Sequence, residues 1–342
     1  MIPSPTLLEI GIVLRIGILG AARIARSFCN GVRGSSKVAV TAIASRSQAS
    51  AKAFAKEFDI AKTYAPYEAL LDDPDIDAIY NPLPNALHAP WSIRAAGAGK
   101  HVLCEKPFGA TAADVVAMQA AARRFGVHIV EAYPYLAQPQ TRLVRQLVRD
   151  GAIGDLRTIH ALFTFPLRDW SDIRMDPSLG AGSLLDVGCY PLSLTRVLAG
   201  RRATRITAAA DFTETGVDRT LAATLEYGDG PLAQISCSFA AANMRYALII
   251  GDKGVIETHY LNHTTERSAE IRVKRSPKPD AMFETVTSKQ MNGFLAEADS
   301  FADLIAGGNW TGATAQESLD IAEMLDAIAA SARSRTPIEL GA

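Results

Sequence analysis

Residues 14–131 alternate between two patterns, and this alternation restricts the fold more than any other feature of the sequence. Short runs rich in β-branched and other apolar residues (LRIGIL, KVAVTAIA, DAIY, HVLC and VHIV) are separated by alanine-rich segments with the spacing of amphipathic helices. Parallel strands need crossover connections, which are usually helices that cover both faces of the sheet. The sequence therefore predicts an α/β domain with a parallel sheet over residues 14–135.

After residue 135 the pattern changes to strands in series. Residues 203–286 hold successive β-rich runs that alternate apolar and polar side chains, separated by turn signals such as YGDG and GDKG. Helical segments lie near residues 138–150 and 182–199, and two more, near 291–306 and 313–330, follow the strands. We expect a second α/β domain over residues 136–335 with a large, mainly antiparallel open sheet. Residues 1–13 are expected to form a short extension outside the fold.

Composition and charge exclude several classes of protein. The 342 residues carry 35 lysines and arginines against 36 acids, which gives no reason to expect a nucleic acid or an anionic membrane as partner. No window approaches about 18 uninterrupted apolar residues, and the first residues lack the features of a signal peptide. The four cysteines are scattered without a CxxC pair, as expected for buried thiols in a reducing compartment. These features predict a cytoplasmic protein.

A glycine-rich loop follows the first strand, at the position where a dinucleotide-binding fold holds a pyrophosphate. Residues 20–25 (GAARIA) have alanine where the GxGxxG fingerprint has its second and third glycines. The first glycine permits the tight turn, and the start of the next helix offers free backbone N–H groups to phosphate oxygens. We predict that Gly20, Ala22, Arg23 and Ile24 bind the cofactor. Taken alone, the loop is also explained as an ordinary strand–helix turn.

The end of the second strand bears on the choice between NAD and NADP. Ser45 and Arg46 stand where an NAD-preferring protein usually has a carboxylate for the ribose hydroxyls. An arginine and a hydroxyl suit a 2′-phosphate, through charge-assisted hydrogen bonds and stacking on the adenine. NADP is therefore the favoured cofactor and NAD the alternative. The alternative interpretation of Arg46 is a solvated surface arginine.

The stretch KHVLCEKPFG ends an apolar strand with an acid and a base. Lys106 lies at the carboxyl end of the fourth predicted strand, the edge at which open α/β sheets bind their ligands. Further along, GAGSLLDVGCYPLSL places Asp186 and Tyr190 four residues apart, and so on one face of the segment if it is helical. Taken separately, Lys106 is also explained as a surface lysine, and Asp186 and Tyr190 are also explained as hydrogen-bonded core residues.

Two other reductase chemistries lack the residues that they require. None of the nine tyrosines has a lysine four residues later, as a short-chain dehydrogenase would. The close histidine pair, His259 and His263, has no carboxylate arrangement suited to zinc. We therefore predict no metal.

Taken together, the motifs resemble those of the Gfo/Idh/MocA family of oxidoreductases. The glycine-rich loop, SR after the second strand, NPLPNALH, AGKHVLCEKP and GAGSLLDVGCYP occur in that order and spacing, and the resemblance extends over the chain from Leu14. The sequence is most similar to the branch of dimeric dihydrodiol dehydrogenase, NADP-dependent D-xylose dehydrogenase and ketosugar reductases, which have tyrosine at the position of Tyr190. The resemblance implies an N-terminal Rossmann domain and a C-terminal domain whose open sheet forms a homodimer or homotetramer.

The resemblance also implies roles for individual residues. Lys106 and Tyr190 would form the catalytic pair, with Asp186 as the supporting carboxylate, and the Lys106–Pro107 bond is expected in cis. Leu136 stands where several sugar-processing relatives have arginine, so their substrate contacts are not carried over. The further residues expected at the site are Glu105, at the nicotinamide ribose, Leu83, Asn85 and His88, lining the cofactor, and Arg168, Trp170 and Arg174, as candidates for substrate or cofactor contact.

The expected reaction is hydride transfer between NADP and an alcohol or carbonyl carbon, or the hemiacetal C1, of a sugar or related polyol. A tyrosine pKa of about 10 is too high for a base at neutral pH, and a lysine ammonium nearby lowers it. Tyr190 would then accept the substrate proton in oxidation and donate it in reduction. A trans-dihydrodiol dehydrogenase is the alternative, and a non-catalytic NADP-binding sensor or scaffold is the alternative of another class. The presence of Lys106, Asp186 and Tyr190 together favours the enzyme.

Overall fold

The structure is a computed structural model that describes residues 13–260, 262 and 269–341. Twelve of the thirteen residues of the predicted N-terminal extension therefore lie outside the described residues, as does His263. The chain divides into two compact units, which we describe separately. The first contains residues up to 109 together with 113–137 and 291–315, and the second contains 110–112, 138–290 and the residues from 316 onward.

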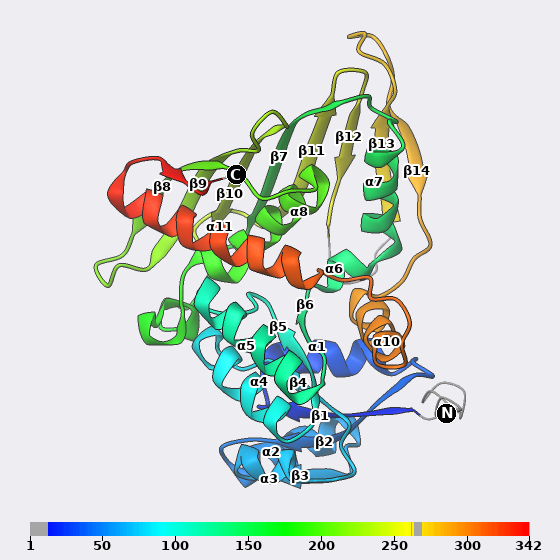
Figure 1. Ribbon diagram of the computed structural model, residues 1–342, viewed down its shortest axis with the longest axis vertical. Coiled ribbons are helices and arrows are strands. Elements are labelled where there is room, and N and C mark those ends of the chain that lie inside the picture. Colours follow the sequence, from blue (N-terminus) through cyan, green and yellow to red (C-terminus); the bar gives the residue numbers. More distant parts are fainter. Residues whose placement is uncertain (1–12, 261, 263–268, 342) are drawn as a thin grey trace. The chain divides into compact units, whose positions relative to one another are not determined.

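The first unit is built on a six-stranded sheet in which every neighbouring pair is parallel (Figure 1). Its order is β3-β2-β1-β4-β5-β6, which is that of dinucleotide-binding folds, with the reversal of strand order between β1 and β4. The predicted parallel α/β sheet is confirmed. The strands are β1 (Leu14–Leu19), β2 (Val38–Ala44), β3 (Lys62–Tyr64), β4 (Ala78–Asn81), β5 (His101–Glu105) and β6 (Ile129–Ala132).

Helices join these strands and cover the sheet. Most of their sequence segments are amphipathic, so that one side of the helix is buried and the other is solvated, whereas all four residues of α6 are buried. In α1, for example, the buried ring of Phe28 stacks on Tyr80 of β4 with ring centres 4.0 Å apart. The helices are α1 (Arg23–Val32), α2 (Gln48–Phe58), α3 (Tyr67–Leu71), α4 (His88–Gly97), α5 (Ala112–Phe125), α6 (Pro134–Ala137) and α10 (Gly293–Ile305), with a short 3-10 turn, η2 (Asn85–Leu87).

Helix α10 comes from a distant part of the sequence and completes the core of the first unit. Phe294 meets the Phe28 ring edge to face at 6.5 Å, and a Cβ on Gly31 would lie only 2.7 Å from the Cβ of Phe294. Lys37 and Asp303 form an ion pair at 2.7 Å. Residues 291–315 thus pack with the first unit. The sequence pattern had placed them in the second domain, which it predicts over residues 136–335. The apolar pattern of a helix predicts that it is buried but not which sheet it covers.

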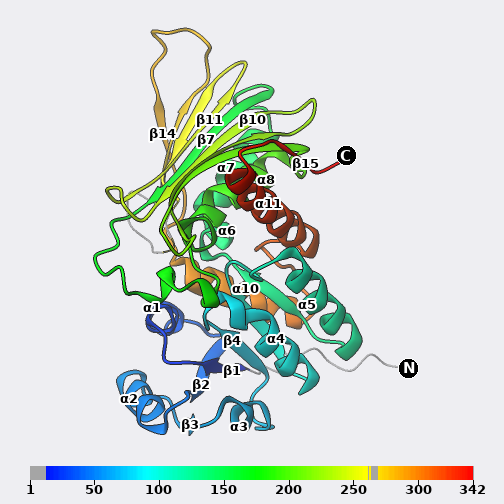
Figure 2. The same ribbon diagram turned by 90° about the vertical axis from the view of Figure 1, so that its left-hand side faces the viewer.

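The second unit contains a nine-stranded sheet of order β14-β13-β12-β11-β7-β10-β9-β8-β15 (Figure 2). Its neighbours are antiparallel except for β7 and β10, which run parallel. The predicted mainly antiparallel sheet is therefore confirmed. The strands are β7 (Leu156–Thr164), β8 (Arg205–Phe212), β9 (Asp218–Glu226), β10 (Leu232–Ser238), β11 (Met244–Gly251), β12 (Val255–Thr258), β13 (Glu270–Lys274), β14 (Glu284–Thr287) and β15 (Ile338–Glu339).

The helices of the second unit agree with the predicted segments to within a few residues, and they lie on one face of its sheet (Figure 2). The predicted helix near residues 182–199 is divided into a π-helical turn and a regular α-helix. The elements are α7 (Pro139–Arg149), α8 (Cys189–Ala199), α11 (Ala315–Ser334), the π-helical turn η5 (Leu184–Gly188), and the 3-10 turns η3 (Ile173–Met175) and η4 (Pro177–Leu179). None of the helices in the described residues is long and apolar enough to span a bilayer.

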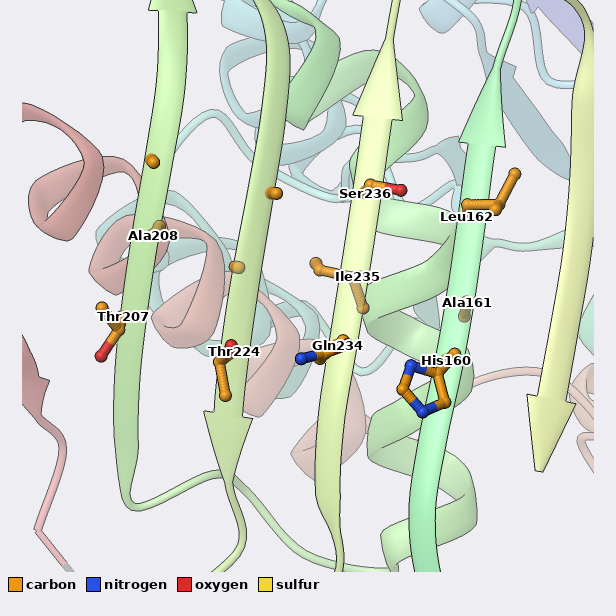
Figure 3. Close-up of a pocket in the computed structure, with 12 residues that line it drawn as sticks. His160, Ala161, Leu162, Thr207, Ala208, Thr224, Gln234, Ile235 and Ser236 are labelled. Carbon is orange, nitrogen blue, oxygen red and sulfur yellow. The ribbon is translucent and has the colours of Figure 1, made fainter. Parts of the chain in front are cut away.

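Figure 3 shows a close-up of the opposite face of this sheet, across the neighbouring strands β7, β10, β9 and β8. His160, Gln234 and Thr224 stand on this face and line a shallow hollow, whereas the side chains of Ala161 and Ile235 are buried. This is the open sheet that the sequence predicted. Association of two or four copies through it stays a prediction.

Candidate active site

The loop after β1 has the geometry expected of a phosphate site. Gly20 has a φ of +91°, a conformation that strains any residue with a Cβ, and a Cβ there would lie 3.1 Å from Leu83. Helix α1 begins at Arg23 after an extended Ala22, and no side chain of the described residues caps its first turn. Its first backbone N–H groups therefore lack an intrahelical acceptor, which is the arrangement that binds anions at helix N-termini. These residues fit the pyrophosphate of a dinucleotide.

Ser45 and Arg46 follow β2 directly. Ser45 is buried, with its backbone N–H bonded to the carbonyl of Tyr64 at 3.1 Å, whereas Arg46 is exposed. Burial raises the pKa of Tyr67, and the charge of Arg46 partly opposes this rise. The Tyr67 hydroxyl lies 3.7 Å from the position that a Cβ on Gly20 would occupy. Arg46 is thus an exposed cation directly after β2, and its contact with a 2′-phosphate stays a prediction.

His88, which the sequence predicted at the cofactor, links two loops of the first unit. It is 1% exposed, and its ring nitrogens lie 2.8 Å from the carbonyl oxygen of Pro107 and 2.7 Å from that of Leu83. Burial lowers its pKa to about 4, although both carbonyls favour the protonated ring. His88 thus fixes the backbone at Leu83 relative to the backbone beside Lys106. Its own contact with the cofactor, and that of Asn85 at the start of η2, stay predictions.

Strand β5 ends at Glu105, and Lys106 follows in a cis bond to Pro107, as expected. Glu105 is buried, and its Oε1 accepts a hydrogen bond of 2.6 Å from the hydroxyl of Tyr80 on β4. Lys106 is half-buried at the carboxyl end of β5. Because β5 lies beside β4, where the strand order reverses, Lys106 stands at the edge of the sheet at which such folds bind ligands.

Two further carboxyl groups accompany Glu105 in the first unit, and the sequence motifs did not indicate either. Glu131 on β6 accepts a hydrogen bond of 2.9 Å from the backbone of Phe108. Glu297 on α10 is fully buried, and neither of its oxygens has a hydrogen-bond partner among the described residues. Burial, with the charges of Glu105 and Glu131, raises the pKa of Glu297 well above its ordinary value. This environment favours the neutral acid at Glu297.

In the second unit, Asp186 and Tyr190 flank the start of α8. Asp186 lies in the π-helical turn and is half-buried, whereas Tyr190 is 4% exposed. Pro191 has no N–H with which to continue the regular hydrogen-bond ladder, and the wider π turn precedes it. The charges of Asp186 and Tyr190 both act on the guanidinium of Arg245. Both groups therefore lie within electrostatic range of the same cation, and that they share one face stays a prediction.

Asp186 forms an ion pair within its own unit. The Nε of Arg174 donates to its Oδ2 at 2.7 Å, and Nη1 of Arg174 donates to Asp172 at 3.1 Å. Arg174, a candidate for substrate contact, thus holds Asp186 in place. The other two candidates, Arg168 and Trp170, are exposed between β7 and η3. Substrate contact by any of the three stays a prediction.

Two residues that the sequence reasoning missed surround Tyr190. The Nδ2 of Asn262 donates to the Tyr190 hydroxyl at 3.0 Å. Arg245 of β11 stacks on Phe163, whose ring packs edge-on against Tyr190 with centres 5.3 Å apart. A signal for Arg245 was present in MRYALII, because the arginine occupies the same alternate register as the alanine and isoleucine that are buried.

In the described residues, no group of three or more His, Cys, Asp and Glu side chains is arranged to hold a metal. Nδ1 of His259 lies 2.9 Å from the carbonyl oxygen of Arg245. All four cysteines are buried and free of disulfide bonds. Lys106 belongs to the first unit and Tyr190 to the second, so their catalytic pairing stays a prediction.

Comparison with known proteins places both units in one family. The chain matches the model of the oxidoreductase family with an NAD-binding Rossmann fold over residues 14–133, and that of the GFO/IDH/MocA C-terminal domain over residues 141–257. It is 35% identical over 330 residues to D-xylose 1-dehydrogenase (NADP(+)) 2 of Haloferax volcanii, covering 96% of this chain and 100% of the relative. It is 34% identical over 275 residues to trans-1,2-dihydrobenzene-1,2-diol dehydrogenase of Mus musculus, covering 78% and 80% respectively.

Among solved structures, the chain is similar to a 3-ketoreductase from Actinomadura kijaniata in complex with NADP and TDP-benzene. The TM-score is 0.85 and the sequence identity is 29%, and the match covers 93% of this chain and 98% of the ketoreductase chain. Two further structures of that enzyme carry a lysine-to-alanine and a tyrosine-to-phenylalanine substitution. These two positions are as far apart in sequence as Lys106 and Tyr190. From the two matched units and the full-length relative, we conclude that the chain belongs to the Gfo/Idh/MocA family of oxidoreductases.

Proposed function

We propose that the protein is an NADP-dependent oxidoreductase that transfers a hydride between the nicotinamide and an alcohol or carbonyl carbon, or the hemiacetal C1, of a sugar or related polyol. The observation that carries the proposal is the position of Lys106 at the ligand-binding edge of a dinucleotide-binding sheet. The xylose dehydrogenase and ketoreductase relatives, which extend over both units, support a sugar as the substrate class.

In this proposal the first unit holds the cofactor. The Gly20 loop and the start of α1 bind the pyrophosphate, Ser45 and Arg46 bind the 2′-phosphate, and Glu105 lies toward the nicotinamide ribose. When bound, NADP supplies the carbon that accepts or donates the hydride. Glu105 is suited to a fixed position because the Tyr80 hydroxyl holds its carboxylate from the neighbouring strand.

Tyr190 moves the proton in the proposed mechanism. In oxidation its phenolate accepts the proton of the substrate hydroxyl, and in reduction its hydroxyl donates a proton to the carbonyl oxygen. The Lys106 ammonium favours the phenolate. Asp186, oriented by Arg174, is suited to hold Lys106 or a second substrate hydroxyl. The substituted lysine and tyrosine of the ketoreductase support this pair, since their spacing is the same.

The substrate class is tested by measuring NADPH formation with aldoses, inositols and trans-dihydrodiols, and NADPH oxidation with ketosugars. Turnover of the sugars or inositols is the expected result. A clear preference for trans-dihydrodiols would replace the sugar proposal with the second candidate, which the mouse relative favours. Binding of NADPH without turnover of any compound would instead indicate a sensor or scaffold.

Arg46→Ala is expected to raise the KM for NADP+ by about 10- to 100-fold, because it removes charge-assisted hydrogen bonds to the 2′-phosphate. The KM for NAD+, which lacks that phosphate, should change little. Initial rates with each cofactor measure the difference. Arg33→Ala removes another exposed arginine of the first unit and serves as the control. Equal effects of Arg46→Ala on both cofactors would contradict the assignment of this residue.

A further inference from the structure

Arg245 lies beside Tyr190 in a position that the proposed mechanism does not use. It is paired directly with Phe163 across the antiparallel strands β11 and β7, and its guanidinium carbon lies 3.9 Å from the centre of the Phe163 ring. The same ring packs against Tyr190. Strand register and ring stacking therefore fix a half-buried positive charge on the ring that packs against Tyr190.

The charges around Arg245 show which group it affects most. Burial lowers the pKa of Arg245, and the charges of Tyr190, Tyr260 and Asp186 oppose this effect, with Tyr190 the largest of the three. The ion pairs of the described residues include no carboxylate partner for Arg245; Asp186 is paired with Arg174 at 2.7 Å. Electrostatic interaction is mutual, so a guanidinium stabilised by an ionised Tyr190 stabilises that phenolate equally.

We propose that Arg245 is a positioning residue for Tyr190, a second cation that favours the phenolate from within the second unit. The Asn262 amide, which donates to the same oxygen at 3.0 Å, adds a hydrogen bond that also favours the ionised form. The catalytic meaning of this inference rests on the proposed function. The electrostatic interaction between Arg245 and Tyr190 lies within the second unit, so it can be measured without a known substrate.

Titration of Tyr190 by tyrosinate absorbance tests the interaction without any substrate. The signal of Tyr190 is the difference between each protein and the same protein carrying Tyr190→Phe, which leaves Tyr260 in both spectra. The other charged groups of this region, namely Asp186 with its partner Arg174 and, in the proposed mechanism, Lys106, are unchanged across the series. The midpoint is expected to rise by about one pH unit in Arg245→Gln and in Arg245→Met. Arg245→Lys should recover at least half of the shift.

Arg272→Gln is a matched control, because Arg272 lies on β13 of the same sheet and stacks on Phe283 at 4.5 Å, but its guanidinium pairs with Glu257. It should leave the midpoint unchanged. Once a substrate is found, the rising limb of the kcat–pH profile for oxidation should move in parallel with the titration. Folded Arg245→Gln or Arg245→Met protein with an unshifted midpoint would overturn the inference. A shifted midpoint in a protein that turns over no substrate would overturn only the proposed function.

Discussion

Tyr190→Phe is expected to reduce kcat by about 10²- to 10⁴-fold, the contribution typical of a positioned general acid or base. The phenyl ring retains the edge-on packing against Phe163, so the fold of the second unit should persist. NADPH binding should be nearly unchanged, because the residues proposed to hold the cofactor are in the first unit. Steady-state rates in both directions, with NADPH affinity from fluorescence titration, separate a loss of proton transfer from a loss of binding.

Lys106→Met should cause a loss of similar size and raise the pH at which oxidation begins, since Lys106 acts through the phenolate. The double variant should be little worse than either single variant, because residues that act as a unit are not additive. Lys52→Met, which removes an exposed lysine on α2, is the control. Near wild-type turnover by both Tyr190→Phe and Lys106→Met with NADP bound would contradict the assigned pair.

Asp320→Ala is expected to destabilise the second unit by about 3–5 kcal/mol, the usual cost of leaving one partner of a buried ion pair without compensation. Arg196 of α8 and Asp320 of α11 meet at 2.6 Å, and their side chains are only 8% and 7% exposed. Gln316 donates to the second oxygen of Asp320 at 2.7 Å. The pair therefore joins α11 to the helix that carries Tyr190, and loss of Asp320 would leave the arginine charge buried.

Calorimetry should show the transition of the second unit lowered by roughly 10 °C in this variant. Asp229→Ala is the matched control, because the Asp229–Arg201 pair is exposed by 87% and 57%, and such pairs contribute about 0–1 kcal/mol. Arg196→Met combined with Asp320→Leu should recover most of the lost stability, since apolar replacements remove both buried charges. Equal transition temperatures for Asp320→Ala and Asp229→Ala would show that the buried pair contributes no more than the exposed one.

The sequence predicted most of the fold because its signals are local. Strand and helix periods, the Gly20 turn and the proline after Lys106 each act over a few residues, and the structure confirms the two kinds of sheet that they indicated. The assignment of α10 could not be obtained in this way. Its apolar side is compatible with either sheet, and the close approach of Gly31 to Phe294 joins residues that are far apart in the sequence.

For the candidate site, the sequence predicted the residues that belong to motifs and missed those that act through packing. The alternation in β11 indicates only that Arg245 points inward, and Glu297 is one of three acids in α10, so neither has a local signature of function. His88 belongs to a motif, yet its two ring nitrogens lie against the carbonyl oxygens of two separate backbone segments. A motif indicates that a residue matters at a site, whereas only tertiary contacts show what it touches there.

The origin of α10 also governs the order in which the chain can be folded during synthesis. Phe28 and its neighbours on α1 are covered only when Phe294 and Phe301 arrive, about nine-tenths of the way along the chain. A ribosome that has completed the six parallel strands has therefore not yet supplied the last layer of their core. This apolar surface of the nascent first unit therefore stays exposed until the strands of the second unit and α10 have been translated. An N-terminal fragment ending at residue 137 would lack α10 and would expose the surface permanently.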